Sequence, residues 1–495
     1  MMCSSTNEEK DYSLPPALDL KLDKDVFKRK EIIFAVGLPL GATFKTVSSK
    51  MQHFRTGYLA LPKFNKIYTD ANGVKRKLIL VRRIDDPKDW EFLRELNIDI
   101  PKAPEEDISY LESHPNAVLV ENCSPNEGGG EDILPSKPSA FRFPIGYENL
   151  TFERALKAVL PPDMDGVTGF SLVGHVAHFN LKPAALPYRK LIGQIAIDKL
   201  PQVRTVINKA AKIESEFRTF AVDLMAGEEN YLTEVKENGV TFHLDFSKVY
   251  WNSRLGTEHS RIVNEIKEVA KISESTTPVV VYDVFAGVGP FSLPLARFDT
   301  CQVLANDLNP VSFQFLEENI RKNSSKKHPL TEDKIRCFNL DGRDFIKQIV
   351  LPHFEKALQS GVSQFFMLMN LPGLAIEFLD VFRDRCLENC TPKPIHTRCY
   401  YFIRHSLENS NSKALKCQQA DSDARQRVCE ALDIDPTAVS INGSQCPSLS
   451  PCGIHLTDWN VRFVRNTAPL RDMYCLEFDL HLPTCDMGSK RLRLE

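Results

Sequence analysis

Residues 251–495 are predicted to form a doubly wound α/β fold with a largely parallel sheet. Apolar, β-branched runs such as Val279–Tyr282 and Val303–Ala305 alternate there with segments of helical periodicity, which is the pattern of parallel strands covered by helices. In such sheets a ligand binds beyond the carboxyl ends of the strands. Four predicted strands are followed there by polar side chains that we expect to share one crevice: Asp283, Asp307, Asp341 and Asn370.

Two smaller modules are expected before this one. The polar, glycine-rich segment 121–140 is typical of a flexible linker, so residues 1–120 are predicted to be a small N-terminal domain. Residues 141–250 are predicted to be a middle α/β domain that opens with an amphipathic helix near Phe152. Within it we expect a helix over residues 191–213 and a pair of strands at 220–224 and 240–246.

The composition limits the class of protein. The chain has 495 residues and no apolar stretch near the roughly 20 residues of a membrane-spanning helix, so we expect no membrane partner. With 62 basic and 65 acidic residues the net charge is -3, so a nucleic-acid site must be a local patch. The 13 cysteines, without a C-x-x-C pair, predict reduced thiols and no metal site. The N-terminus shows no clear targeting signal, which predicts cytosol or nucleus.

The loop after the first strand argues against a dinucleotide. Gly287 and Gly289 allow a ligand to approach the backbone, but Ser292 stands where a dinucleotide-binding fingerprint has its third glycine. Asp283 also crowds the place that a pyrophosphate would take, because a carboxylate repels it. We therefore expect a ligand without phosphates that carries a cationic amino group near Asp283.

The next two strands supply groups suited to an adenosine. Asp307 ends the second strand, where a carboxylate can accept both hydroxyls of a ribose. Asp341 and Gly342 follow the third strand and are placed for an adenine edge. For any one acid a helix-capping role is an equally good interpretation, but four polar residues in register favour a site. Together they predict S-adenosylmethionine rather than a nicotinamide.

The fourth strand and the domain entrance bear on the methyl acceptor. Asn370-Leu371-Pro372 is followed by Gly373, where amino-methylating enzymes have an aromatic residue that clamps an exocyclic amine. We therefore expect an endocyclic nitrogen as acceptor, with Asn370 orienting the base. Taken alone, Thr257 and Glu258 favour a capped helix start, so a structural role for Glu258 stays open at this point.

Five segments of the chain form one combined signature: Phe246–Trp251, Arg254 with Thr257–His259, Asp283–Phe291, Asn306–Pro310 and Met369–Pro372. Together they resemble the eukaryotic and archaeal tRNA (guanine(37)-N1)-methyltransferases. The resemblance covers roughly residues 141–389. It implies a class I Rossmann-like methyltransferase domain, a preceding α/β domain that binds RNA and supports catalysis, and an N-terminal domain that contacts the outer corner of the tRNA.

The resemblance also implies roles for single residues. Glu258 would take the proton from guanine N1, Arg218 would hold the guanine oxygen and Asn370 would position the base. The implied partner is a tRNA with guanosine at position 37, bound by a monomer in cytosol and nucleus, with the mitochondrial matrix as a further compartment. The implied contacts to S-adenosylmethionine are His259, Asp283, Asp307, Leu308, Asp341, Gly342 and Asn370.

Three other functions stay open. A sister enzyme that transfers the aminocarboxypropyl group of the same cofactor to a tricyclic tRNA guanine would have no use for a base at N1 such as Glu258. A non-catalytic RNA-binding protein of this fold should have lost some of Glu258, Arg218, Asp307 and Asn370. A nicotinamide-dependent dehydrogenase is disfavoured because the third glycine is missing.

Overall fold

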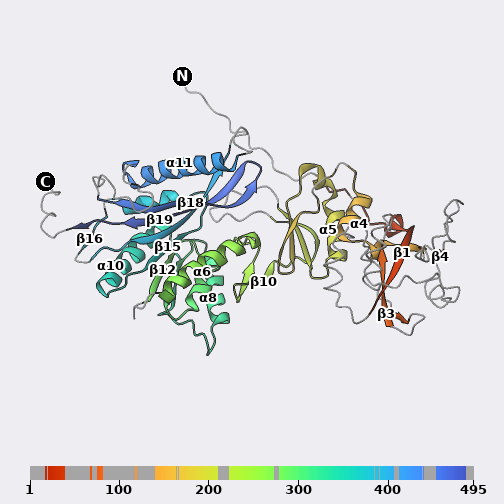
Figure 1. Ribbon diagram of the computed structural model, residues 1–495, viewed down its shortest axis with the longest axis horizontal. Coiled ribbons are helices and arrows are strands. Elements are labelled where there is room, and N and C mark those ends of the chain that lie inside the picture. The colour runs from red at the N-terminus through yellow and green to blue at the C-terminus, as the bar shows by residue number, and fades with distance from the viewer. Residues whose placement is uncertain are drawn as a thin grey trace, which may run out of the picture.

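A computed structural model describes residues 17–18, 20–39, 67–69, 75–81, 118–119, 140–162, 164, 167–209, 222–272, 278–383, 385–388, 391–405, 412–436, 439 and 453–485. In Figure 1 the elements fall into three groups, which follow one another in chain order. No helix in these ranges is both long and apolar enough to cross a membrane.

A seven-stranded sheet forms the core of the C-terminal group. Its order is β14-β13-β12-β15-β17-β19-β18, and the first five strands are parallel while β19 is antiparallel to both of its neighbours. The chain adds strands to one side of β12 and then to the other, so the switch point lies between β12 and β15. The predicted doubly wound sheet is confirmed, and the antiparallel edge is an addition. The strands are β12 (Val279–Asp283), β13 (Cys301–Asn306), β14 (Ile335–Phe338), β15 (Phe365–Met369), β17 (Ile395–Arg404), β18 (His455–Ala468) and β19 (Arg471–His481).

Helices cover both faces of this sheet because its strands are apolar on both sides. On one face Val281 packs in a cluster with α6 (Gly256–Ile272), α7 (Ser292–Ala296) and α8 (Pro310–Asn323). On the other face Tyr282 belongs to a second cluster. That second layer consists of α9 (Gly342–Phe345), η6 (Ile346–Val350), α10 (Leu351–Gln359), η7 (Ala375–Phe382) and α11 (Lys413–Leu432).

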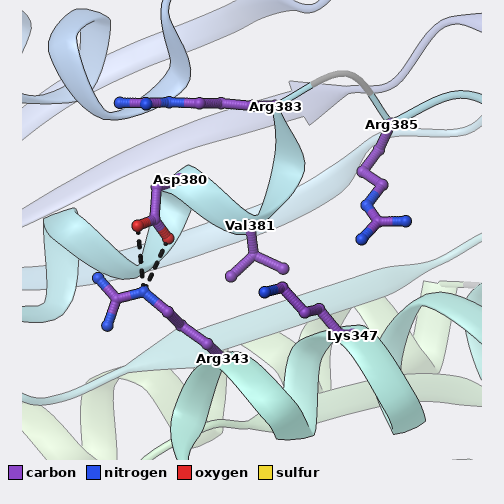
Figure 2. A pocket seen from close by; sticks show the side chains of 6 residues that line it. All are labelled: Arg343, Lys347, Asp380, Val381, Arg383 and Arg385. Carbon is purple, nitrogen blue, oxygen red and sulfur yellow. Dashed lines mark hydrogen bonds and ion pairs between the residues drawn. The ribbon is translucent and has the colours of Figure 1, made fainter.

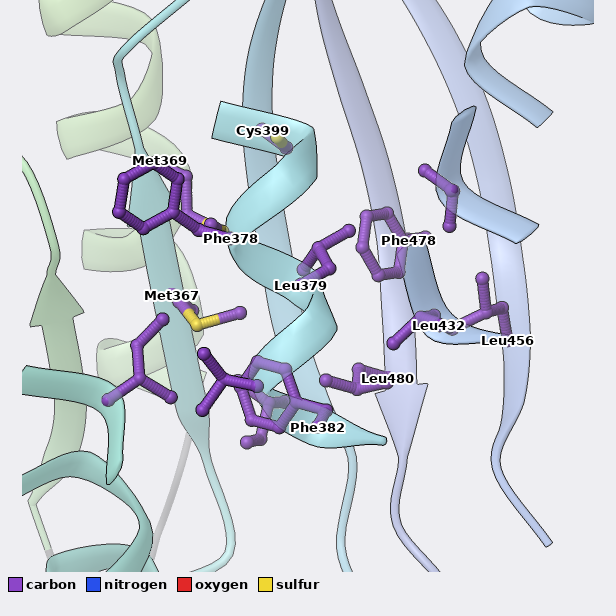
Figure 3. Packing of buried hydrophobic residues seen from close by; sticks show 14 of the residues in the cluster. Met367, Met369, Phe378, Leu379, Phe382, Cys399, Leu432, Leu456, Phe478 and Leu480 are labelled. Carbon is purple, nitrogen blue, oxygen red and sulfur yellow. The ribbon is translucent and has the colours of Figure 1, made fainter. Parts of the chain in front are cut away.

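Figure 3 shows how η7 is fixed on the sheet. Phe378 lies beside Met369 of β15, Leu379 points toward Phe478 of β19, and Phe382 lies near Leu480 of the same strand. Each fully buried side chain of this size contributes roughly 1.5–3 kcal/mol to folding. The segment that follows Asn370 is therefore held rigidly against the sheet.

The middle group is a four-stranded sheet in the order β6-β7-β8-β9. Helix α4 (Phe152–Val159), capped by the Thr151 side chain, and η4 (Pro183–Tyr188) precede α5 (Arg189–Lys199). The helix expected over 191–213 therefore ends at Lys199, and the chain turns at Pro201 into a strand. The strands are β6 (Phe170–Val173), β7 (Val176–Phe179), β8 (Thr205–Lys209) and β9 (Val222–Gly227).

The expected pairing of strands 220–224 and 240–246 is wrong. β9 pairs with β8, whereas β11 (Val240–Asp245) forms a hairpin with β10 (Leu232–Glu237). Both residues of the connecting turn, Asn238 and Gly239, have positive φ, which suits a tight two-residue hairpin. This local turn outweighs the more distant pairing.

The N-terminal group is a five-stranded sheet, β2-β3-β1-β5-β4. Its last long strand in the chain, β5, pairs with β1, so the segment expected to open the middle domain begins in this sheet. Most of the expected linker lies outside the described residues. The other domain limits stay predictions. The strands are β1 (Arg29–Pro39), β2 (Ile67–Thr69), β3 (Lys75–Val81), β4 (Val118–Leu119) and β5 (Ala140–Ile145).

Short elements complete the described chain. The helical turn η1 (Lys24–Phe27) precedes β1, η3 (Tyr147–Asn149) follows β5 and η5 (Ser253–Leu255) follows β11. The short strand β16 (Leu387–Glu388) pairs with β20 (Thr484–Cys485). Cys386 is disulfide-bonded, so the expectation of reduced thiols throughout is wrong at this position.

Candidate active site

Asn306, the last residue of β13, joins the loops that follow three strands. Its Nδ2 donates to the carbonyl oxygens of Val284 and Leu340 at 3.1 and 3.0 Å, and its Oδ1 accepts from the Leu340 amide at 2.9 Å. The side chain is almost fully buried, so these bonds fix the strand ends relative to one another. Sequence reasoning did not single out Asn306, although a polar residue at the end of an apolar strand is a usable signal.

Asp283 ends β12 as a fully buried carboxyl group. Its Oδ2 accepts a hydrogen bond from Ser292 Oγ at 2.6 Å, while its Oδ1 has no partner among the described residues. Burial raises the pKa of Asp283 to about 7, although the Ser292 bond lowers it. A buried oxygen of this kind is stabilised by a cationic group of a ligand, as the sequence predicts.

Asp307 follows β13 and shapes the glycine loop. Its Oδ2 accepts from the Gly287 amide at 2.8 Å and its Oδ1 from the Asn309 amide at 2.9 Å. Burial raises the pKa of Asp307 to about 6, against the effect of these two bonds. Each oxygen keeps a lone pair for a further donor, such as a ribose hydroxyl. The adjacent Leu308, in the turn after β13, leaves 36% of its surface exposed.

The two glycines of the loop have different tasks. Gly287 has φ of 58° and open space around a hypothetical Cβ, so its backbone is accessible to a ligand. Gly289 has φ of 95°, and a Cβ there would overlap the Cδ1 methyl of Leu293 and lie 2.7 Å from that of Leu316. Gly287 therefore serves access and Gly289 serves packing.

The loop after β14 packs between two aromatic rings. The Asp341 side chain caps α9 by accepting from the Arg343 amide at 2.8 Å. A Cβ on Gly342 would lie 2.8 Å from a ring carbon of Phe378 and 2.9 Å from one of Phe285. These rings meet edge to face with centroids 5.0 Å apart, so Gly342 is required for their close approach.

Asn370 follows β15 directly, on the strand beside β12. Its Oδ1 is buried and has no hydrogen-bond partner in the described part of the chain. Asp283 and Asn370 thus each present an unsatisfied buried oxygen at the same edge of the sheet, next to the switch point. Buried oxygens are normally paired, so this arrangement fits a ligand that donates hydrogen bonds.

Glu258 lies in the first turn of α6 and is held by two side chains. Its Oε1 accepts from Arg261 Nη2 at 2.6 Å and from the Tyr400 hydroxyl at 2.9 Å, and its Oε2 accepts from Arg261 Nε at 2.9 Å. Burial lowers the pKa of Arg261, but the hydrogen bonds and charge of Glu258 help to raise it above its usual value, so the guanidinium stays charged. The register of β17 with β15 sets Met369 beside Cys399, so Tyr400 is level with Asn370. Glu258 is thereby positioned at the ligand edge.

Comparison with known proteins identifies the family. Residues 233–389 match the TRM5/TYW2 methyltransferase domain and residues 152–230 match the TYW2 N-terminal domain. A Drosophila melanogaster tRNA (guanine(37)-N(1))-methyltransferase is 38% identical over 379 residues, which are 74% of this chain and 73% of that protein. The chain belongs to this family. The predicted resemblance is therefore confirmed.

A second relative by sequence agrees with this assignment. The Xenopus tropicalis tRNA (guanine(37)-N(1))-methyltransferase is 39% identical over 355 residues, which are 70% of this chain. The chain spans 62% of the length of that protein. A crystal structure of Trm5b from Pyrococcus abyssi aligns over 90% of this chain and 99% of its own, with 21% identity and a TM-score of 0.47.

The remaining predicted residues have distinct positions. His259 is buried, bonds Glu237 Oε1 through Nδ1 at 2.6 Å and meets the Phe291 ring edge to face at 4.7 Å. Arg218 lies outside the described residues. Thr257 lies inside α6, which begins at Gly256, rather than at its cap. The cofactor and substrate roles of the predicted residues stay predictions. In the ranges described, no cluster of three His, Cys, Asp or Glu side chains is arranged for a metal ion.

Two functional candidates escaped sequence reasoning. Arg261 stands three residues after Glu258 on the same helix, a spacing that predicts a contact, so it could have been found. Tyr400 lies 142 residues away and reaches Glu258 only through the sheet. No local pattern marks it.

Proposed function

We propose that this chain transfers a methyl group from S-adenosylmethionine to N1 of guanosine at position 37 of a tRNA, and so helps to maintain the reading frame. The observation that carries the proposal is the Glu258 carboxylate, fixed by Arg261 and Tyr400 at the edge where Asp283 and Asn370 keep unpaired buried oxygens. The family assignment supports the same reaction.

The strand ends suit this cofactor. When bound, S-adenosylmethionine supplies an electrophilic methyl group on a sulfonium that needs placement rather than activation. Asp283 would accept from its cationic amino group, Asp307 from its ribose hydroxyls, and Gly287 leaves the backbone accessible. Asp341, Gly342, Leu308, His259 and Asn370 complete the proposed cofactor contacts.

The chemical step depends on a proton transfer. Guanine N1 carries a proton at neutral pH, so its lone pair becomes available only when a base removes that proton. Glu258 would take the proton from N1 while N1 bonds to the methyl carbon, whose bond to the sulfonium sulfur would break and leave S-adenosylhomocysteine. The two contacts of Arg261 and the hydroxyl of Tyr400 hold the carboxylate in one rotamer, which avoids reorganisation during the step. Arg218 would stabilise charge on O6, and Asn370 would orient the base.

The aminocarboxypropyl alternative explains less of this arrangement. That transfer does not involve N1, so the fixed carboxylate of Glu258 would have no task. A binding protein without activity would likewise have no need for the buried oxygens of Asp283 and Asn370. We further propose that the enzyme acts as a monomer in cytosol and nucleus, and in the mitochondrial matrix.

The test is product identification. Purified protein is incubated with S-adenosylmethionine and an unmodified tRNA transcript that has guanine 3′ of the anticodon, and the digested RNA is analysed by mass spectrometry. We expect 1-methylguanosine. An aminocarboxypropyl adduct, or no modified nucleoside, would contradict the proposal.

A further inference from the structure

A basic cleft lies between the α9–η6 segment and η7, two segments that start at the ligand edge of the sheet and lead away from it. Its volume is about 430 Å³, and it is lined by four cations, one carboxylate and one valine: Arg343, Lys347, Arg383, Arg385, Asp380 and Val381. In Figure 2 the side chains of Lys347 and Arg385 extend toward the space beside Val381. The positive excess is local, because the whole chain carries a net charge of -3.

Two of the cations are already engaged. Arg343 bonds Asp380 through Nε at 3.0 Å and lies over the Phe378 ring at 4.3 Å. Arg383 donates to the carbonyl oxygens of Ala431 and Glu430 in the last turn of α11. These contacts hold the walls of the cleft in place, and the Asp380 carboxylate that lines it is already paired with Arg343.

The other two cations lack a counter-charge. Within the described ranges neither Lys347 nor Arg385 forms an ion pair, and both side chains are exposed. Like charges brought together raise the free energy of the folded state unless an anion joins them. The cleft therefore suits a phosphate.

Both walls of the cleft begin at the ligand edge of the sheet. Arg343 directly follows Gly342, and η7 begins a few residues after Asn370. A polymer whose base enters the proposed site carries a phosphate on every nucleotide, so phosphates of neighbouring nucleotides are the candidates to contact these walls. An enclosed site for a small anion would bury its cations, whereas Lys347 and Arg385 remain exposed, as is usual for contacts to a nucleic-acid backbone.

We propose that this cleft binds backbone phosphates of the RNA substrate, with Lys347 and Arg385 as the contacting residues. The proposal rests on the proposed function, since it gives the RNA a second attachment point outside the catalytic residues. Such contacts position the substrate and do not read its sequence.

The test is RNA binding as a function of salt. Fluorescence anisotropy with a labelled tRNA transcript compares the wild type, the Lys347→Ala/Arg385→Ala variant and the control Lys326→Ala/Lys327→Ala. The control removes two exposed lysines from the loop before β14, at the amino end of that strand and thus opposite the ligand edge. Melting temperatures verify folding, and Lys347→Glu, which reverses the charge at an exposed position, gives a second variant.

We expect the cleft variant to weaken RNA binding on the order of tenfold near 0.1 M salt and to lower the slope of log Kd against log salt by roughly 1.4–1.8, for two lost phosphate contacts. Lys347→Glu should weaken binding more than Lys347→Ala. The control, the methylation rate at saturating RNA and the affinity for S-adenosylhomocysteine should stay at wild-type values.

Two results would overturn the inference while the wild type still methylates tRNA. One is an unchanged Kd and slope in the cleft variant. The other concerns pyrophosphate added to the melting experiment. If the cleft variant loses a thermal stabilisation that pyrophosphate gives the wild type, while its RNA binding is unchanged, the cleft belongs to a small anion. A wild type that neither binds nor methylates the transcript would instead refute the proposed function itself.

Discussion

The buried carboxyl of Asp283 should make cofactor affinity depend on pH. Its pKa is about 7 because burial disfavours the charged form, and only the carboxylate attracts a cationic amino group. At pH 6 roughly a tenth of the free protein has this carboxylate ionised, so affinity should fall about tenfold per pH unit below 7, or about 1.4 kcal/mol. The affinity is fully present above pH 7 and is lost as pH falls. Asp307, with a pKa of about 6, adds to the loss at lower pH.

Calorimetric titration with S-adenosylhomocysteine between pH 6 and 8.5 measures this dependence. Repeating it in buffers of different ionisation enthalpy should reveal proton release on binding near pH 7, because the cation lowers the pKa of Asp283. In Asp283→Asn the affinity should be weak at pH 8 and nearly flat down to pH 6.5. A wild-type affinity that does not change from pH 8.5 to pH 6 would show that ionisation of Asp283 does not control cofactor binding.

Three further predictions concern single contacts. Asn306→Leu keeps the branched shape of the side chain but removes its hydrogen bonds to three backbone groups, and it should lower the free energy of unfolding by about 3 kcal/mol or more, as measured by urea denaturation. Gly289→Ala should destabilise the fold by about 3 kcal/mol, because its Cβ would overlap packed leucines. Gly287→Ala should cost only about 1–2 kcal/mol of stability and should mainly weaken cofactor binding. Equal effects of the two variants would contradict their separate tasks. Tyr400→Phe should slow single-turnover methylation about three- to tenfold, the value of one hydrogen bond, and an unchanged rate would exclude a positioning role.

The ligand edge of the sheet was predictable because strand periodicity is a local property. Asp283, Asp307 and Asn370 stand at the ends of apolar runs in the sequence, and in the structure Asp283 ends β12 while Asp307 and Asn370 directly follow β13 and β15. Tyr400 could not be predicted, because its contact to Glu258 depends on the order of strands across the sheet.

Two predictions for the middle domain were wrong, each for a reason that lies in the sequence pattern. Aliphatic residues on one side of a helix continue past Lys199 into β8, and the period alone does not show where the element changes. The hairpin of β10 and β11 was missed although Asn238-Gly239 is a strong turn signal, because the two strands are short and partly polar.

The single-turnover rate of methylation by Glu258→Gln tests most directly whether Glu258 is the base that takes the proton from guanine N1. Glu265→Gln is the matched control, because Glu265 lies one turn after Arg261 on α6 and also contacts its guanidinium. If Glu258 takes the proton from guanine N1, its variant should form 1-methylguanosine roughly 10²–10⁴-fold more slowly with cofactor affinity unchanged, while the control stays within about threefold of wild type. A Glu258→Gln enzyme that methylates N1 at the wild-type rate would contradict the account.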